Sequence, residues 1–264
     1  MPWPFRLSQQ GRGLRRTAPI HAYVGANGSG KSLAMVYDTL PSLEAGREVL
    51  STVKILDYAG EDPKAAHPLY TCLSRWVQLV DPEHCDVLLD EVTGTANSRT
   101  AMGLPVQLQN LFVQLRRRDV VLRYTCPNWA RTDVILREVT QAVTHCRGYW
   151  ASEVEDSMWK QRRLFRWTTY DAVDWEEWSM QRAESAKPIA SQWFYRPGKD
   201  APNAYDTLDY VESLDLMDFA GLCMTCGGKR QHPRCNCKHG ALDDHLPGGG
   251  SPEGAGAPVE VHRW

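Results

Sequence analysis

The stretch that decides the fold is residues 20–32, with the sequence Ile-His-Ala-Tyr-Val-Gly-Ala-Asn-Gly-Ser-Gly-Lys-Ser. It begins with a short apolar run, Ile20–Val24, which is typical of a buried strand. From residue 32 the apolar side chains recur at helical spacing as far as residue 40, before Pro41. The loop between strand and helix matches the pattern G-x-x-x-x-G-K-[ST] at Gly25, Ala26, Asn27, Gly28, Ser29, Gly30, Lys31 and Ser32.

The residue types of this loop suit the binding of a phosphate group. Glycine lets the backbone turn tightly beside phosphate oxygens, because no Cβ stands in the way. Successive backbone N–H groups then point inward, and the following helix directs its positive end at the same place. We expect Lys31 to reach the β- and γ-phosphates of ATP and the hydroxyl of Ser32 to bind Mg²⁺. The alternative, a glycine-rich turn with an incidental lysine, is disfavoured by the flanking strand and helix.

A second apolar run, Val87–Leu89, ends in Asp90 and Glu91. In phosphate-loop enzymes a buried strand carries an acidic residue at its C-terminal end, beside the phosphate loop. We therefore expect Asp90 to hold Mg²⁺ through water and Glu91 to polarise an attacking water, which favours hydrolysis. A strand that simply ends in solvated acids would be the better interpretation if the chain had no phosphate loop.

The remaining chain alternates short apolar runs with segments of helical spacing. This alternation predicts an α/β fold, a mostly parallel sheet with helices on both faces, as in the RecA-like core of P-loop NTPases. Later strands are expected to extend the sheet antiparallel, with Leu164–Tyr170 pairing with Ala142–Trp150. Further strands are expected at Glu48–Ile55 and Val120–Thr125, and further helices at Val106–Arg117 and Thr132–Arg137.

Composition predicts four parts along the chain. Residues 1–17 are rich in Arg, Gln and Gly and are expected to form a flexible N-terminal arm. Residues 18–207 are the expected ATPase domain, and residues 208–240 form a Cys-rich C-terminal segment. Residues 241–264 contain a Gly-, Pro- and Ala-rich stretch, which predicts a disordered tail.

Charge and hydropathy limit the classes of protein that fit. The 264 residues carry a formal net charge of −2 and a pI near 6.4, which excludes a globally basic nucleic-acid-binding protein. DNA would therefore have to contact a local patch or an assembled ring. No stretch approaches the ~18 uninterrupted apolar residues of a membrane helix. The N-terminus lacks an apolar segment of signal-peptide length, so we expect a cytoplasmic protein.

Half of the eight cysteines lie close together near the C-terminus, at Cys223, Cys226, Cys235 and Cys237. Paired cysteines supply the tetrahedral thiolate ligands that Zn²⁺ prefers, and a segment with so little apolar mass needs a metal to fold. We predict a zinc site here, in which His232 or His239 could replace one cysteine. The alternative is a set of reduced thiols in a mobile tail. The four remaining cysteines, which are scattered, are expected to be core residues: Cys72, Cys85, Cys126 and Cys146.

Two groups of side chains are candidates for a nucleic-acid-binding surface, and each also has a structural interpretation. The arginines at 116–118 and Arg123 form the densest positive region, which either complements a helix C-terminus or lines a surface that faces DNA or another subunit. Trp159, Trp167, Trp175, Trp178 and Trp193 are interleaved with Arg162, Arg163 and Arg166. Such aromatics can stack on single-stranded bases, but large aromatics are chiefly core residues, so packing is favoured.

Taken together, these motifs resemble the zonular occludens toxin-like family, within the FtsK–HerA group of P-loop ATPases. The resemblance runs roughly over residues 20–207. Beyond the phosphate loop and the two acids, it rests on residues 111–137: a basic helix end, a strand, Pro127, and Asp133 followed by Arg137. The segment Tyr195–Thr207 is similar to the closing region of the family. In composition and motif order the chain also resembles ATP-binding proteins found on actinobacterial mobile elements.

The resemblance implies a motor-like ATPase that handles DNA in phage assembly, packaging or mobile-element transfer. It also implies a homo-oligomeric ring in which an arginine reaches the γ-phosphate of the neighbouring subunit, and Arg131 and Arg137 are the candidates. The chain departs from the family by lacking an apparent transmembrane helix, which favours a soluble relative. It also has Thr125-Cys126 where many members carry a glutamine as nucleotide sensor. Thr125 can still hydrogen-bond a phosphate or water, so it is the candidate sensor here.

The sequence leaves three functions in competition. The first is an ATP-driven, oligomeric motor that handles single- or double-stranded DNA. The second is a nucleotide-dependent switch or assembly adaptor that hydrolyses ATP slowly and recruits a protein partner through the Cys-rich tail. A small-molecule kinase is weaker, because the sequence shows no convincing lid over an acceptor pocket.

Overall fold

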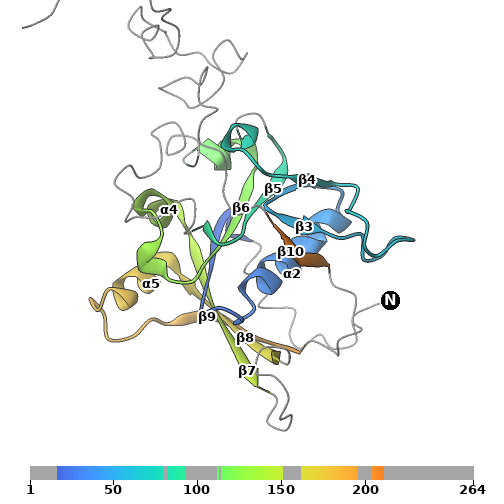
Figure 1. Ribbon diagram of the computed structural model, residues 1–264. Helices are drawn as coiled ribbons and strands as arrows, with labels where there is room; N and C mark the ends of the chain where they lie inside the picture. The colour runs from blue at the N-terminus through green and yellow to red at the C-terminus, as the bar shows by residue number, and fades with distance from the viewer. Residues whose placement is uncertain are drawn as a thin grey trace, which may run out of the picture.

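The fold is built on one mixed β-sheet. The computed structural model describes residues 17–79, 82–92, 112, 114–150, 162–195 and 204–210. Within these residues the sheet has eight strands in the order β4-β2-β5-β6-β1-β7-β8-β9 (Figure 1). The strands are β1 (Ile20–Val24), β2 (Glu48–Ser51), β4 (Tyr70–Cys72), β5 (Cys85–Leu89), β6 (Val121–Cys126), β7 (Ala142–Trp150), β8 (Arg162–Asp171) and β9 (Pro188–Tyr195).

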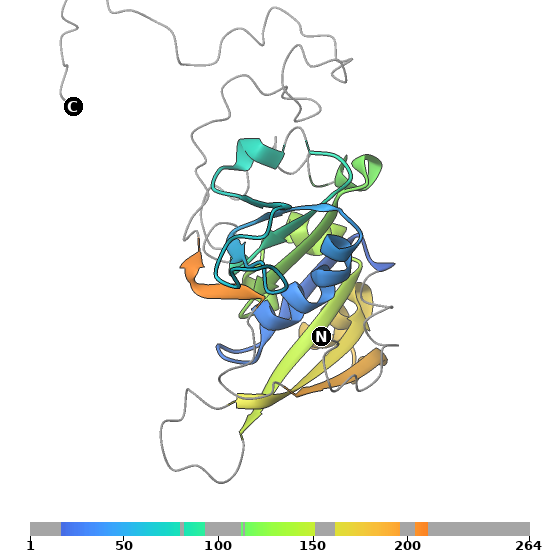
Figure 2. The ribbon, with the colours of Figure 1, turned by 90° about the vertical axis from the view of Figure 1, so that its right-hand side faces the viewer.

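The sheet has a parallel part and an antiparallel extension. All neighbours from β4 to β7 are parallel, whereas β8 runs antiparallel to both β7 and β9. In Figures 1 and 2 the extension, β7 to β9, reaches below the parallel strands. This arrangement confirms the predicted α/β fold, and the pairing of β7 with β8 confirms the predicted hairpin.

Helices cover both faces of the sheet. One face carries α2 (Lys31–Glu44), and the other carries α4 (Val134–Val139) and α5 (Ala172–Ser179) (Figure 1). The α2 face has its own buried cluster around Met35 and Tyr23, and the opposite face has a second cluster around Leu122 and Trp175. Every residue of β1 and β5 is buried, because central parallel strands are covered on both faces.

Helix α2 continues through Pro41, which corrects the expected end before that residue. Proline lacks an N–H donor, so the helix loses one backbone hydrogen bond there. The residues that follow are nevertheless held in place, because Leu43 is buried in the core beneath the helix. The helix closes where the N–H of Ala45 donates to Pro41 O and Gly46 adopts a φ of 81°.

The expected strand Glu48–Ile55 is divided in two by a turn in the backbone at Ser51 and Thr52. The Ser51 hydroxyl accepts a hydrogen bond from Val53 N (3.0 Å), while Thr52 N donates to the main sheet at Leu88 O (3.0 Å). Residues Val53–Ile55 then form β3, which pairs with β10 (Tyr205–Tyr210) in a separate two-stranded sheet. Strand β10 thus runs past residue 207, where the sequence places the end of the ATPase domain.

Other segments differ in detail from the sequence prediction. The helix expected at Thr132–Arg137 is α4, because the Asp133 carboxylate accepts from Ile135 N (2.9 Å) and caps the helix there. The sequence pattern does not predict β4 or α5. Most of Val106–Arg117 lies outside the described residues, and the part that ends it is a 3-10 turn, Leu115–Arg118.

Several predicted features also lie outside the described part of the chain. They are the N-terminal arm apart from Thr17, residues 211–240 with the four clustered cysteines, and the tail 241–264. Within the described ranges, no helix is both long and apolar enough to cross a membrane.

Candidate functional site

The loop at residues 25–30 connects β1 to α2 and is packed tightly against β7 and β8. A Cβ at Gly25 would lie 2.4 Å from the carbonyl oxygen of Cys146 in β7. A Cβ at Gly30 would lie 2.7 Å from the ring of Phe165 in β8, and Gly30 has a φ of 84° that other residues rarely adopt. Gly25 is therefore required because no space remains for a Cβ. Gly30 is required for the same reason and also for its backbone conformation.

Lys31 is a buried cation at the start of α2. Its side chain is only 8% exposed, and its Nζ donates a 3.3 Å hydrogen bond to the carbonyl oxygen of Ala26. No carboxylate pairs with it within the described part of the chain. Because a buried charge is costly unless an opposite charge compensates it, this position suits an anionic ligand.

Two further groups beside Lys31 offer hydrogen bonds. The Ser29 hydroxyl is buried and has no hydrogen-bond partner among the described residues. Gly30 is the N-cap of α2 and offers no side-chain cap, so the first N–H groups of the helix lack the partner that a capping side chain supplies. A phosphate group would satisfy these donors together with Lys31, so the residues of the loop fit a nucleotide.

The structure brings Ser32, Asp90 and Thr125 together from three different elements. Ser32 Oγ donates to both carboxylate oxygens of Asp90, at 2.8 and 3.0 Å. Thr125 Oγ1 donates to Asp90 Oδ1 at 2.6 Å. The contact is possible because β6 lies between β1 and β5, so Thr125 near its end stands between the loop and Asp90. The adjacent hydroxyl and carboxylate oxygens of Ser32 and Asp90 fit Mg²⁺, which prefers oxygen ligands.

Glu91 adopts an unusual backbone conformation beside this cluster. Its φ is 52°, a left-handed value that costs energy for a residue other than glycine. Its backbone N–H donates to Thr125 Oγ1 at 2.8 Å, and its side chain is exposed. Thr125 thus holds both acids at once, accepting from Glu91 and donating to Asp90.

Two residues of the site were not found from the sequence. Thr52 Oγ1 accepts a 2.8 Å hydrogen bond from Asp90 N, and Phe165 packs against Gly30. Thr52 lies in the turn between β2 and β3, and Phe165 lies in the antiparallel extension. Neither position carries a motif, so only the pairing of the strands reveals the two contacts.

The two arginines that are candidates to reach a neighbouring subunit, Arg131 and Arg137, differ in their contacts. Arg137 forms an ion pair with Glu176 of α5 and donates through Nε to Thr132 O (3.3 Å). Trp129 Nε1 donates to the same carboxylate, so Arg137 belongs to a cluster that joins α4 to α5. The side chain of Arg131 is exposed and forms no hydrogen bond or ion pair within the described residues. Neither arginine bonds to residues 25–32.

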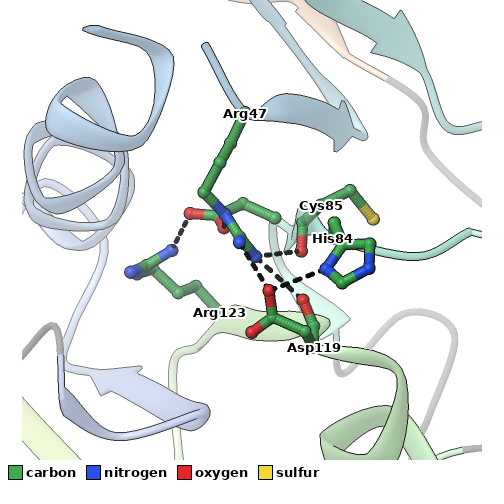
Figure 3. A network of polar contacts seen from close by, with 6 residues as sticks. Arg47, His84, Cys85, Asp119 and Arg123 are labelled. Carbon is green, nitrogen blue, oxygen red and sulfur yellow. Dashed lines mark hydrogen bonds and ion pairs between the residues drawn. The ribbon is translucent and has the colours of Figure 1, made fainter. Parts of the chain in front are cut away.

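Arg123 does not line a surface, which corrects one interpretation of the basic region. It is 1% exposed and pairs with Asp86 of β5 at 2.5 Å. Arg47 bridges Asp86 (3.1 Å) and Asp119 (2.8 Å), and His84 lies 3.1 Å from Asp119 (Figure 3). Burial opposes the charge of Arg123, but Asp86 raises its pKa overall, so the guanidinium stays protonated. Asp86 stands near the start of β5, at the opposite end of that strand from Asp90.

Most of the scattered cysteines are core residues, as expected. Cys85, Cys126 and Cys146 are buried, whereas Cys72 in the edge strand β4 is exposed, which corrects its assignment. Cys126 accepts from Gly25 N through its carbonyl oxygen (3.3 Å). Burial raises the pKa of the Cys126 thiol to about 11, so this thiol beside the loop is neutral near pH 7.

The tryptophans divide into two groups. Trp167 and Trp175 are buried, as the packing interpretation requires. Trp178 and Trp193 are each 40% exposed, so for these two that interpretation is incomplete. Trp159 lies outside the described residues.

Comparison with known proteins found similar solved structures but no family. No family model matches the chain, and no curated protein matches it. Among solved structures, the N-terminal domain of zonular occludens toxin from Neisseria meningitidis is 18% identical, with a TM-score of 0.42. The match covers 71% of this chain and 98% of that chain. The chain is thus similar to a structure from the family that its sequence motifs resemble.

The genome-packaging NTPase B204 from Sulfolobus turreted icosahedral virus 2, in complex with ATP-gammaS, is also similar. It is 11% identical, with a TM-score of 0.40, and the match covers 67% of this chain and 97% of that chain. The DNA-packaging ATPase B204 from Sulfolobus turreted icosahedral virus is 12% identical with the same TM-score, covering 68% and 98%. These similarities concern the fold alone, and the function is inferred from the site itself.

Proposed function

We propose that this chain is a Mg²⁺-dependent ATPase whose nucleotide site is residues 25–32. The observation that carries the proposal is Lys31, a buried cation with no carboxylate partner among the described residues, at the start of a helix. The next residue, Ser32, donates a 2.8 Å hydrogen bond through Oγ to Asp90 Oδ1. A phosphate-loop enzyme holds its metal at this pair of residues. Lys31 and the N–H groups of the loop would bind the phosphates of ATP.

Each acidic residue has a separate role in this proposal. Ser32 and Asp90 are the candidate holders of Mg²⁺, which when bound offsets negative charge on the phosphates. Glu91 is the candidate general base, because its exposed carboxylate can accept a proton from water. Thr125 is a positioning residue, since its hydroxyl is engaged with Asp90 and with the backbone of Glu91.

We propose further that the ATPase works as an oligomeric motor that handles DNA. The supports are the motif resemblance and the exposed, unpaired state of Arg131 among the described residues. Arg131 is the better candidate for a finger that reaches a neighbouring subunit, because Arg137 is held by Glu176 within its own chain. An arginine finger stabilises charge on the transferred phosphoryl group, so Arg131→Ala should lower turnover without weakening nucleotide binding.

One observation favours the second function, a slow nucleotide switch. The single O–H donor of Thr125 is used by Asp90, so the hydroxyl cannot at the same time donate to a phosphate oxygen, as the amide of a glutamine would. In this case the Cys-rich segment would recruit the protein partner. We propose a zinc site at Cys223, Cys226, Cys235 and Cys237, which elemental analysis of protein purified without chelator should find at one ion per chain.

The proposal is tested by measuring ATP binding and steady-state turnover of the full chain. Lys31→Ala should lose nucleotide binding, because the loop loses its cation. Glu91→Gln should bind ATP as the wild type does but hydrolyse it at a rate lower by about 10²–10⁴-fold. Retained affinity in Lys31→Ala would refute the nucleotide site.

Adding single- or double-stranded DNA to the same turnover assay separates the motor from the switch. Stimulation by DNA is expected of the motor. Tight ATP binding with slow turnover that neither form of DNA changes would favour the switch.

A further inference from the structure

One face of the antiparallel extension is covered by a helix at one end only, among the described residues. On the α2 side, Trp167 and Phe194 pack against Tyr37, with ring centroids 5.5 and 5.1 Å away. On the opposite side, Trp175 of α5 covers one end of the strands by contacts with His145 (5.6 Å) and Tyr170 (5.1 Å). The strands continue beyond α5 on that side, and we call their remaining part the open face. Its residues are Arg147, Tyr149, Leu164, Arg166, Ser191 and Trp193.

Strand register places these residues side by side. Arg147 pairs with Arg166 across β7 and β8, and Arg166 pairs with Trp193 across β8 and β9. Because side chains alternate along a strand, Tyr149, two residues after Arg147, points to the same side of the sheet. The open face is therefore a property of three strands that are distant in sequence.

Rings and guanidinium groups alternate over this face. Arg147 Cζ lies 5.2 Å from the centre of the Tyr149 ring, and Arg166 Cζ lies 5.6 Å from the centre of the Trp193 ring. The two rings are 5.2 Å apart and inclined by 42°. Arg166 Nε also donates to Ser191 Oγ (3.2 Å), which holds its guanidinium over the indole. Both cations are thus oriented by contacts within the face.

Most side chains of the open face are exposed to solvent. Trp193 is 40% exposed, and both arginines are exposed. Within the described residues no carboxylate pairs with Arg147 or Arg166. A large aromatic side chain that is 40% exposed, beside two arginines without a carboxylate partner among the described residues, is typical of a binding surface.

We propose that the open face binds single-stranded DNA, with bases stacked on Tyr149 and Trp193 and phosphates beside Arg147 and Arg166. Surfaces that bind single strands combine positive charge along the backbone with aromatic rings on which bases stack. A duplex fits poorly, because its base faces are already stacked within the helix. A second copy of the chain would have to bring a carboxylate to each arginine, whereas a nucleic-acid strand brings a phosphate with every nucleotide. The choice of DNA over RNA rests on the proposed function.

The test is the affinity of the full chain for a fluorescently labelled oligothymidylate, measured by anisotropy without nucleotide. Trp193→Ala should weaken binding about tenfold, because one stacking platform is lost. Trp193→Phe should restore most of the affinity, because it keeps a ring. The matched control is Trp178→Ala: Trp178 is equally exposed but lies on α5, so its loss should leave the affinity unchanged.

The arginines are tested by the dependence of affinity on salt. Arg166→Gln should weaken binding and reduce the slope of log affinity against log salt by about 0.7, the value for one phosphate contact on a single strand. An unchanged slope would remove Arg166 from the surface. Circular dichroism and thermal unfolding should show that each variant is folded.

Other outcomes would overturn the proposal. Equal losses in the Trp193→Ala and Trp178→Ala variants, or tighter binding of duplex DNA or of an oligoribonucleotide, would contradict it. So would unchanged DNA affinity with an altered oligomeric state in Trp193→Ala, which would assign the face to a subunit contact. Lys31→Ala should bind the oligothymidylate normally, so failure of the nucleotide site is distinguishable from failure of the open face.

Discussion

At the scale of single residues, Thr125 is the one side chain of the described residues that the structure shows hydrogen-bonded to both acidic residues. Thr125→Val removes the hydrogen bonds to Asp90 Oδ1 (2.6 Å) and from Glu91 N (2.8 Å) while keeping the shape of the side chain. We expect turnover to fall about 10²-fold, because small misplacement of catalytic groups has effects of that size, while ATP binding is kept. Thr125→Ser keeps the hydroxyl and should retain most activity. Similar kcat values for the two variants would show that the hydroxyl does not position the acids.

Gly30 offers a residue-scale comparison with Gly46, because both have positive φ values, 84° and 81°. Alanine at either position meets the same backbone strain, about 1–2 kcal/mol. Only at Gly30 does the added Cβ also meet a neighbour, the ring of Phe165 at 2.7 Å, since nothing lies within 4 Å at Gly46. We expect Gly30→Ala to lose more stability in urea unfolding than Gly46→Ala, and it alone should lose ATP affinity.

At the scale of elements, the Asp86–Arg123 pair ties β5 to β6 inside the sheet. Both side chains are buried, so removing one charge leaves the other without its ion-pair partner. Asp86→Asn should reduce the free energy of unfolding by about 3–5 kcal/mol. Asp119→Asn, which removes an exposed partner of Arg47, should cost less than about 1 kcal/mol. Urea unfolding measures both, and equal effects would show that burial of the pair does not matter.

At the scale of the whole molecule, β8 connects the nucleotide site with the open face. Phe165 packs against Gly30 of the loop, and the next residue, Arg166, points to the opposite side and contacts Trp193. We expect single-stranded DNA to stimulate ATP turnover and Trp193→Ala to lose this stimulation while keeping the basal rate. Stimulation that survives in Trp193→Ala, measured at saturating ATP, would show that DNA acts through another surface.

Local patterns were enough to predict the central elements and the residues of the loop. The run Ile20–Val24, the glycines and Lys31 are adjacent in sequence, so their spacing alone indicates a strand, an anion-binding loop and a helix. The same holds for Val87–Leu89 followed by Asp90 and Glu91, because a buried strand leaves an apolar run.

The sequence by itself thus determined the α/β class and the candidate phosphate and metal residues. Only the tertiary structure decided which distant residues meet. It placed β6 between β1 and β5, so that Thr125 reaches Asp90. It divided the expected strand Glu48–Ile55 at Thr52. It also buried Arg123 and left Trp193 exposed. The physical reason is that strand order and register are long-range properties. The environment of a side chain depends on which strand lies beside it, and residues distant in sequence supply that neighbour.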